Sequence, residues 1–396
     1  MNFSRKITED TFYVGASDRR LALFENIFPI PKGVSYNSYV ITDEKTVLLD
    51  LMDDSVSKQG FENIAGVLDG RKLDYVVINH MEPDHCSNLD ELILRYPEVK
   101  VVGNAKILKM IEQFYDIDVT ERFVTVNEKD TLELGKHTLT FVNAPMVHWP
   151  EVMVTYDLYT KSLFSADAFG TFGALSGNIF NDEYDFEAEF SEEARRYYTN
   201  IVGKYGVQVQ ALLKKASELD IKIICPLHGP IWRTNLDYII DKYNKWSLYE
   251  PELDSVLIAY ASMYGNTENA VNVLATVLAE KGAKNIKVYD VSKTDPSYIL
   301  SDAFKYKRIV FAAPTYNGGI YPKMETLLLD LKAHALKNRK VTVFDNGTWA
   351  PSAKKQMLEI LESMKLEVFQ SELTLKSSLK PSDMEALNKL AEEILK

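Results

Sequence analysis

Cysteine is scarce in this chain of 396 residues: Cys86 and Cys225 are the only two, and they form no CxxC pair. That scarcity excludes a disulfide framework and fits a reducing compartment. Long apolar runs are also missing, since no stretch approaches the roughly 18 apolar residues of a membrane span. Residues 1–10 lack the apolar core of a signal peptide. We therefore expect a cytoplasmic protein that has no membrane partner.

Excess positive charge is absent as well. The formal net charge is −12, which argues against a nucleic-acid partner and allows pairing with a basic one. The apolar fraction of 46% and the charged fraction of 26% are ordinary for a globular protein. The length is sufficient for two domains with separate cores and by itself favours two or three domains. A short Pro-containing stretch at 246–254 predicts a linker between domains at 1–250 and 255–396.

The first 145 residues are rich in short β-branched and aromatic runs, between which apolar residues recur at helical spacing. This mixture predicts an α+β layered domain with mixed or antiparallel sheets. Gly135-Lys136 predicts a hairpin turn. The predicted strands are Tyr39–Ile41, Lys45–Leu51, Tyr75–Ile78, Val99–Val102, Phe123–Val126 and Thr138–Val142, and the predicted helices are Leu89–Leu94 and Ile107–Phe114.

The stretch His80-Met-Glu-Pro-Asp-His85 places four potential metal ligands within six residues, directly after a predicted buried strand. In a locally extended path His80, Glu82 and Asp84 share one side, and His85 points elsewhere. One metal rarely takes four ligands from so short a piece, so the pattern predicts two metals side by side. The alternative is a polar loop that happens to hold two of the six histidines.

Three more candidate ligands each follow a predicted strand: His148, Asp167 and His228. A lone histidine there is more often structural, but an unpaired buried carboxylate at Asp167 is costly unless it bridges cations. Gly229 allows a close backbone approach beside His228. We expect His137 and His334 to be solvated surface residues. Cys86 reads as a small buried core residue.

Strand and helix alternate regularly after residue 254, which predicts a doubly wound parallel sheet with a ligand at the carboxyl ends of its strands. The predicted strands are Ser255–Ala261, Ile286–Asp290, Arg308–Ala313, Lys340–Phe344 and Phe369–Leu375. The predicted helices are Glu268–Gly282, Pro296–Phe304, Pro322–Leu336, Ser352–Met364 and Pro381–Leu395.

Three loops at those strand ends carry polar side chains, glycines and aromatic rings. The loop at 262–267 precedes a helix and suits a phosphate, although a capped helix start would also account for Thr267. The loops at 314–319 and 346–349 pair glycine with Tyr316 and Trp349, which suits a flat heteroaromatic ring. The candidate ligand-binding residues are Ser262, Met263, Gly265, Asn266, Thr267, Pro314, Thr315, Tyr316, Asn317, Gly318, Gly319, Asn346, Gly347 and Trp349.

The order HxExDH, His148, Asp167, His228 resembles the dinuclear site of the metallo-β-lactamase superfamily, over roughly residues 30–250. Hydrolases of that superfamily show a second histidine where this chain has Glu82, and a carboxylate shifts the preference from zinc toward iron. The three loops after residue 260 look like the phosphate and ring loops of flavodoxins, except that Tyr264 replaces the usual threonine or serine. Together the two halves resemble a flavodiiron protein.

That resemblance implies an αββα sandwich followed by a flavodoxin-like domain, with two irons and FMN. His80, Glu82 and His148 would hold one iron, Asp84, His85 and His228 the other, and Asp167 would bridge them. Trp149, Phe169 and the pair Tyr197-Tyr198 are expected to shape the pocket. The implied reaction reduces nitric oxide to nitrous oxide, dioxygen to water, or both.

No cysteine follows Cys225, so the resemblance implies a separate electron donor, either rubredoxin or a coenzyme F420-type system. It also implies a head-to-tail homodimer, possibly a tetramer. Two alternatives remain open at this point. One is a dinuclear zinc hydrolase joined to a flavodoxin domain, and the other is an electron carrier whose first domain only binds partners.

Overall fold

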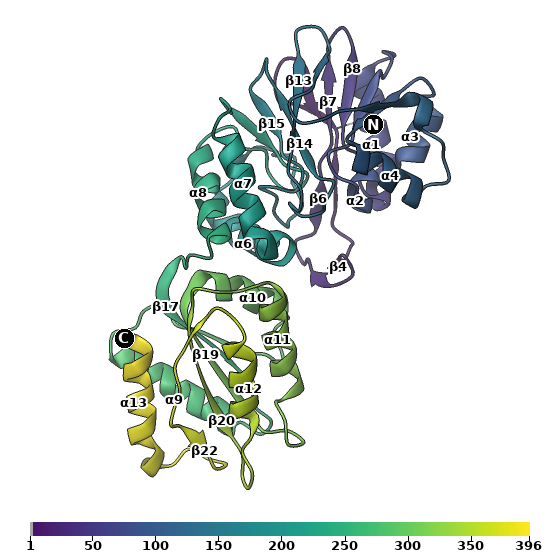
Figure 1. Ribbon diagram of the computed structural model, residues 1–396. Coiled ribbons are helices and arrows are strands. Elements are labelled where there is room, and N and C mark those ends of the chain that lie inside the picture. Colours follow the sequence, from purple (N-terminus) through teal and green to yellow (C-terminus); the bar gives the residue numbers. More distant parts are fainter. Residues whose placement is uncertain (1–2) are drawn as a thin grey trace. The chain divides into compact units, whose positions relative to one another are not determined.

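The chain, seen in a computed structural model that describes residues 3–396, folds into two compact units (Figure 1). The first consists of Met1–Tyr198 and Tyr205–Asn244, and the second of Thr199–Lys204 and Lys245–Lys396. The short segment 199–204 belongs to the second unit, in which Asn200 donates to the Ser297 carbonyl oxygen at 3.2 Å. The domain bounds 1–250 and 255–396 stay a prediction.

The first unit contains two mixed sheets. The seven-stranded sheet has the order β1-β2-β7-β8-β9-β10-β11, and the five-stranded sheet the order β12-β13-β14-β15-β16. In each, parallel and antiparallel pairs occur together, as the sequence predicted. The strands are β1 Arg5–Lys6, β2 Thr11–Tyr13, β7 Tyr39–Thr42, β8 Thr46–Leu49, β9 Tyr75–Val77, β10 Lys100–Gly103, β11 Phe123–Thr125, β12 Thr131–Glu133, β13 Thr138–Asn143, β14 Met153–Asp157, β15 Ser162–Phe164 and β16 Ile223–Cys225.

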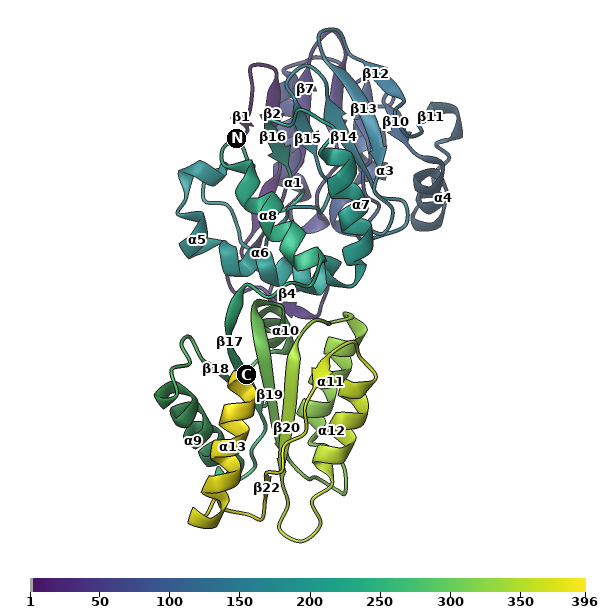
Figure 2. The ribbon, with the colours of Figure 1, turned by 60° about the vertical axis from the view of Figure 1, so that its left-hand side comes forward.

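Helices cover the outer faces of these sheets, with α1, α3 and α4 on one side and α7 and α8 on the other (Figures 1 and 2). Because each sheet meets helices on one face and the other sheet on the second, β8 and β14 are buried along their whole length. The helices are α1 Ser57–Leu68, α2 Pro83–Cys86, α3 Leu89–Arg95, α4 Ala105–Phe114, α5 Phe186–Glu189, α6 Ser191–Tyr197, α7 Gly206–Ala216 and α8 Leu236–Ser247.

Two short strand pairs complete this unit: β3 Ala16–Asp18 with β6 Val34–Tyr36, and β4 Leu23–Phe24 with β5 Phe28–Pro29. All six strands predicted before residue 145 are confirmed to within two residues, and so are both helices. The prediction for His137 is wrong. Its ring is fully buried because Nδ1 pairs with the Asp157 carboxylate at 2.8 Å.

The second unit has one parallel sheet, with β18 Lys287–Asp290, β17 Leu253–Tyr260, β19 Tyr306–Pro314 and β20 Lys340–Asn346 side by side in that order. Helices α9 Asn266–Glu280 and α13 Met384–Leu395 pack together, and α10 Pro296–Lys305, α11 Pro322–Ala333 and α12 Ala353–Glu362 lie on the opposite face (Figure 2). The doubly wound sheet is therefore confirmed, with its order reversing between β17 and β19.

One strand prediction in this unit is wrong. Instead of a single strand at 369–375, two short strands pair with β20: β21 Glu367–Val368 and β22 Thr374–Leu375. From Val341 to Asp345 is four steps along β20, whereas from Val368 to Thr374 is six steps along the partner. The two additional residues loop out and interrupt the pairing.

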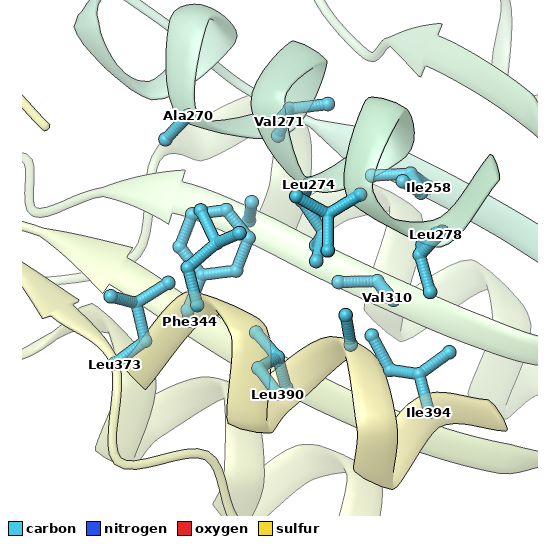
Figure 3. Packing of buried hydrophobic residues seen from close by; sticks show 14 of the residues in the cluster. Ile258, Ala270, Val271, Leu274, Leu278, Val310, Phe344, Leu373, Leu390 and Ile394 are labelled. Atoms are coloured by element: carbon cyan, nitrogen blue, oxygen red, sulfur yellow. The ribbon is translucent and has the colours of Figure 1, made fainter. Parts of the chain in front are cut away.

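The core of the second unit lies between the sheet and the α9–α13 layer (Figure 3). Ile258 and Val310 come from the strands, Leu274 and Leu278 from α9, and Leu390 from α13. These apolar side chains recur at strand and helix spacing, which fixes the register of both layers. Among residues 3–396, every helix is too short or too polar to cross a bilayer.

His334 also departs from its prediction. Only 18% of its side chain is exposed, because Nδ1 contacts the Asp330 carbonyl oxygen at 2.9 Å and Nε2 the Asn200 carbonyl oxygen at 3.2 Å. Lysines in α11 suggested a solvated helix, but the last turn of that helix is half-buried.

Candidate metal centre and ligand cleft

The loop that follows β9 is fixed by a buried carboxylate on the neighbouring strand. Asp50 follows β8 and accepts hydrogen bonds from the Asn79 amide and side chain, both at 2.7 Å, and from the His80 amide at 3.3 Å. Burial raises the pKa of Asp50 to about 6, although its bonds to Asn79 oppose that rise. The point at which His80 leaves the sheet is therefore set by three hydrogen bonds.

The short helix α2 divides the HxExDH stretch into two pairs. Pro83 occupies the first helical turn, so Asp84 and His85 lie on α2 whereas His80 and Glu82 precede it. The predicted extended path is therefore wrong, because Asp84 groups with His85 and not with His80 and Glu82.

The remaining candidate ligands come from the ends of three strands in the five-stranded sheet. His148 follows β13, Asp167 follows β15, and His228 follows β16. All three side chains are buried. The seven candidates thus meet where the two sheets end, and they form two groups: His80, Glu82, His148, Asp167, and Asp84, His85, His228.

Asp167 lies between these two groups. Its Oδ2 is 3.2 Å from both His80 Nε2 and His148 Nε2, and its Oδ1 is 3.1 Å from His85 Nε2 and 3.6 Å from His228 Nε2. Glu82 Oε2 is 3.0 Å from His148 Nε2, and Asp84 Oδ2 is 3.3 Å from His228 Nε2. Four imidazole Nε2 atoms therefore face three carboxylates around Asp167, in the division that the resemblance implies.

Several of these buried atoms have no hydrogen-bond partner among residues 3–396. They include both carboxylate oxygens of Asp84 and of Asp167, both ring nitrogens of His85 and Nε2 of His228. Such atoms are costly to bury unless a cation binds them. A set of three carboxylates and four imidazoles without a thiolate suits iron. Cys86 stays outside the set, since its thiol donates to the Met81 carbonyl oxygen at 3.1 Å.

The charges of the site reinforce one another. Burial acts to raise the pKa of the Asp167 carboxyl, but the His85 and His80 imidazoles outweigh it and hold that pKa well below its usual range. Burial acts to lower the pKa of His148, yet the nearby Asp167 and Glu82 carboxylates raise it to about 9. The Asp167 carboxylate, which lies between the two groups, is therefore anionic at neutral pH and able to bind cations.

Two of the expected pocket aromatics lie beside the ligands. The Trp149 ring centroid is 5.4 Å from that of His80, and the Tyr197 centroid is 5.3 Å from that of His228. Tyr198 and Phe169 instead pack against Tyr243, at 4.9 and 4.5 Å between centroids. The place of Tyr198 and Phe169 in the pocket therefore stays a prediction.

Glu25 is a residue of this site that the sequence did not reveal. It lies in the turn between β4 and β5 with a φ of 49°, and its carboxyl lies close to that of Glu82. Although part of Glu25 is exposed, burial of the carboxyl and repulsion from Glu82 raise its pKa to about 8. A glutamate in a short polar turn gives no sequence signal, because only the fold brings that turn to the metal ligands.

The second unit has a cleft of about 410 Å³ at the carboxyl edge of its sheet, at the point where the strand order reverses. Of the predicted ligand-binding residues, Gly265, Tyr316 and Gly319 do not line it, and the other eleven do. Tyr264, Thr348, Ala350 and Ser377 line it as well. Ser377 follows β22, and the strand-end rule for doubly wound sheets could have found it.

The local geometry shows which polar groups are already engaged. The Ser262 hydroxyl accepts from the Gly265 amide at 3.1 Å, and Gly265 has a φ of +88° with nothing within 4 Å of its missing Cβ. The Gly319 amide donates to the Tyr316 carbonyl oxygen at 2.9 Å, so it is used within the turn. The Thr315 hydroxyl accepts from the Ser352 amide at 2.9 Å. Of the groups in these loops, those at the start of α9 are therefore the ones open to a ligand.

Two aromatic side chains stand over this cleft almost fully exposed: Tyr264 at 92% and Trp349 at 90%. Large aromatic rings are seldom left so exposed without a ligand or partner. The open helix N-terminus suits a phosphate, and the aromatic rings suit a planar heterocycle. The cleft therefore fits a phosphorylated flavin such as FMN.

Comparison with known proteins gives two family matches on this chain. Residues 34–229 match a model described as ODP family beta lactamase, and residues 257–385 match a flavodoxin domain. The chain is 31% identical to the anaerobic nitric oxide reductase flavorubredoxin of Klebsiella pneumoniae, over 96% of this chain and 78% of that protein.

Solved structures agree over nearly the whole chain. The rubredoxin oxygen:oxidoreductase of Desulfovibrio gigas superimposes with a TM-score of 0.93 at 29% identity, covering 99% of this chain and 98% of that one. The flavodiiron protein of Giardia intestinalis gives a TM-score of 0.94 at 26% identity, covering 99% and 95%.

Proposed function

Because the chain belongs to the flavodiiron proteins, we propose that it reduces nitric oxide to nitrous oxide, dioxygen to water, or both, at the centre around Asp167. It is an oxidoreductase whose cofactors are FMN and two irons. The observation that carries this function is the joint presence of a two-metal ligand set containing Glu82 and a flavin-sized cleft in the same chain. The zinc hydrolase alternative is not favoured.

The chain's own residues have separable tasks in this reaction. His80, Glu82 and His148 would hold one iron, Asp84, His85 and His228 the other, and Asp167 would bridge them. When bound, the irons supply two electrons and FMN two more, delivered one at a time. Glu82 adds a negative charge that a histidine would not, and an anionic oxygen ligand favours the higher iron oxidation state. Trp149 and Tyr197 limit the space and the water beside the ligands.

The test compares the two gases directly. The protein, loaded with FMN and iron, is reduced anaerobically and given separate pulses of nitric oxide and dioxygen, and both consumption rates are recorded. We expect at least one rate to exceed that of the His80→Ala/His148→Ala variant by orders of magnitude. Equal rates in the variant would instead identify an electron carrier. If the purified protein contained two zinc ions per chain and hydrolysed esters, the hydrolase alternative would be supported instead.

We further propose a rubredoxin-type donor, since relatives of this chain carry rubredoxin in their names. Reduction of the FMN by purified rubredoxin, compared with reduced coenzyme F420, decides between the two donors. The cytoplasmic location stays a prediction.

We propose as well that the protein is a head-to-tail homodimer in which one chain's flavin serves the partner's metals; a tetramer of two such dimers is the larger form. A mixing experiment tests this. A His148→Ala chain that lacks competent metals is co-folded with a chain whose 262–267 loop is replaced, so that it lacks flavin. Head-to-tail pairing restores part of the activity in the mixture, whereas pairing of sites within one chain leaves the mixture inactive.

A further inference from the structure

A buried carboxylate stands directly behind one of the metal-facing histidines. Glu151 Oε1 is 2.8 Å from His80 Nδ1 and also accepts from the Met81 amide at 2.9 Å. Glu151 is fully buried, and its own carbonyl oxygen accepts from the Asn104 side chain at 2.7 Å. The Nε2 of the same His80 ring faces Glu82 and Asp167, each at 3.2 Å. One imidazole therefore connects Glu151 to the metal position.

The equivalent contacts of the second group are different. His228 Nδ1 donates to the Ser35 carbonyl oxygen at 2.7 Å, which is a neutral acceptor. His85 Nδ1 has no hydrogen-bond partner within residues 3–396. A charged acceptor behind an imidazole makes the opposite nitrogen a stronger donor to a metal than a neutral acceptor does. The two metal positions therefore differ in the hydrogen-bond acceptors behind their histidines: a carboxylate behind His80, and a carbonyl oxygen behind His228.

We propose that Glu151 is a positioning residue that acts through His80, so that the metal held by His80, Glu82 and His148 is bound more tightly and kept more oxidised than its neighbour. This inference rests on the proposed function in taking both metals to be iron. The asymmetry gives the pair an order of electron uptake, because the position with more negative charge is harder to reduce. The iron near Asp84, His85 and His228 is then the first to accept an electron.

The two oxygens of the Glu151 carboxyl are used differently. Oε1 takes both contacts, with His80 Nδ1 at 2.8 Å and with the Met81 amide at 2.9 Å. The second oxygen, Oε2, accepts no hydrogen bond from the described residues. Replacement of that oxygen by an amide nitrogen therefore breaks no existing contact.

Glu151→Gln separates the role of the charge from a purely structural role. The glutamine carbonyl oxygen keeps both hydrogen bonds of Oε1, so the loop at His80 stays anchored while the negative charge is lost. Asp157→Asn is the matched control, because Asp157 makes the same kind of buried pair with His137 at 2.8 Å, outside both ligand groups. Thermal unfolding of each variant checks that it has folded.

The first readout is iron retention by the FMN-containing protein during titration with a ferrous chelator. We expect Glu151→Gln to lower the binding affinity for one of the two irons by about 10–100-fold, which is the range seen when a hydrogen-bond partner behind a metal ligand is lost. The wild type should lose one iron before the other and so show a plateau at one iron per chain; this plateau should shorten in Glu151→Gln, and Asp157→Asn should behave like the wild type. Unchanged retention of both irons in Glu151→Gln would overturn the proposal.

The second readout is a redox titration followed by Mössbauer spectroscopy of the ⁵⁷Fe-loaded protein. In the wild type the two irons should be reduced at separate potentials, and in Glu151→Gln the gap between them should narrow because the potential of the more oxidised iron rises. Equal narrowing in Asp157→Asn, or no change in Glu151→Gln, contradicts a role through His80. If the variant fails to fold, Asn104→Ala, which frees the Glu151 backbone, should move the same potential in the same direction.

These readouts do not depend on which gas is reduced. A wild type that consumes neither nitric oxide nor dioxygen refutes the proposed function, whereas the iron plateau and the potentials still test Glu151.

Discussion

Replacement of Gly229 by alanine should damage the metal centre without touching a ligand. Gly229 has a φ of +76°, and a Cβ at this position would lie 2.0 Å from the Thr171 Cγ2 methyl. Its amide donates to the Ser35 hydroxyl at 2.7 Å, next to the bond from His228 Nδ1 to the Ser35 carbonyl oxygen. Any shift of this backbone therefore moves His228.

The magnitude follows from two separate costs. An L-residue in the left-handed region costs roughly 1–2 kcal/mol. Crowding a packed interior by a methyl group costs about 1–3 kcal/mol more. Together the variant should lose about 2–5 kcal/mol of unfolding free energy. For a unit of this size, each kcal/mol of lost stability lowers the thermal unfolding midpoint by roughly 2–4 °C, so the midpoint should fall by several degrees at least.

Thermal unfolding and iron content of the purified protein are the assays. Thr171→Ser removes the obstructing methyl but keeps the hydroxyl that donates to the Phe172 carbonyl oxygen. The double variant should therefore recover the crowding cost and keep the backbone cost, which a double-mutant cycle measures. Gly177→Ala is the control for backbone strain alone, since its φ is +89° and no atom lies within 4 Å of the added Cβ. A Gly229→Ala protein with wild-type midpoint and full iron would refute this reasoning.

Three other predictions concern separate parts of the molecule. The ion pairs of His137 with Asp157 and Asp10, near Asp43, raise the pKa of His137 above 6.5 against the effect of burial. These ion pairs therefore stabilise the fold fully below about pH 6.5, and their stabilisation is lost as the pH rises through the raised pKa of His137. The difference in thermal unfolding midpoint between the wild type and His137→Asn, measured from about pH 5 to 9, should show this loss. Gly265→Ala should weaken FMN binding about 5–30-fold through backbone strain of roughly 1–2 kcal/mol, measured by flavin fluorescence. Gly282→Ala, with a φ of +96° away from the cleft, should leave FMN binding unchanged. Leu274→Ala should destabilise the flavodoxin unit by about 2–5 kcal/mol because its side chain is fully buried (Figure 3), while iron content stays constant.

Much of the fold could be predicted because local patterns and tertiary packing agree. β17 and β19 are apolar along almost their whole length, as buried parallel strands must be, and α9 repeats its apolar residues at helical spacing. The split of the last strand into β21 and β22 could not be predicted, since the loop between them depends on pairing with β20.

The metal ligands could be proposed from the sequence because carboxylates and histidines after buried strands have a high cost without a cation. Their supporting residues gave no such signal. Glu151 and Asp50 are ordinary acidic residues beside strands, and only the fold places them behind His80. His137 was misjudged for the same reason, because its partner Asp157 lies on another strand.

The convergence of ligands from both sheets has a consequence for how the protein is made. His80 and His85 leave the ribosome long before His228, which follows the last strand of the five-stranded sheet. The pocket that can retain both irons is therefore complete only after the whole first unit has been synthesised and folded. Iron that arrives before that stage meets only part of the ligand set, because His228 is not yet in place.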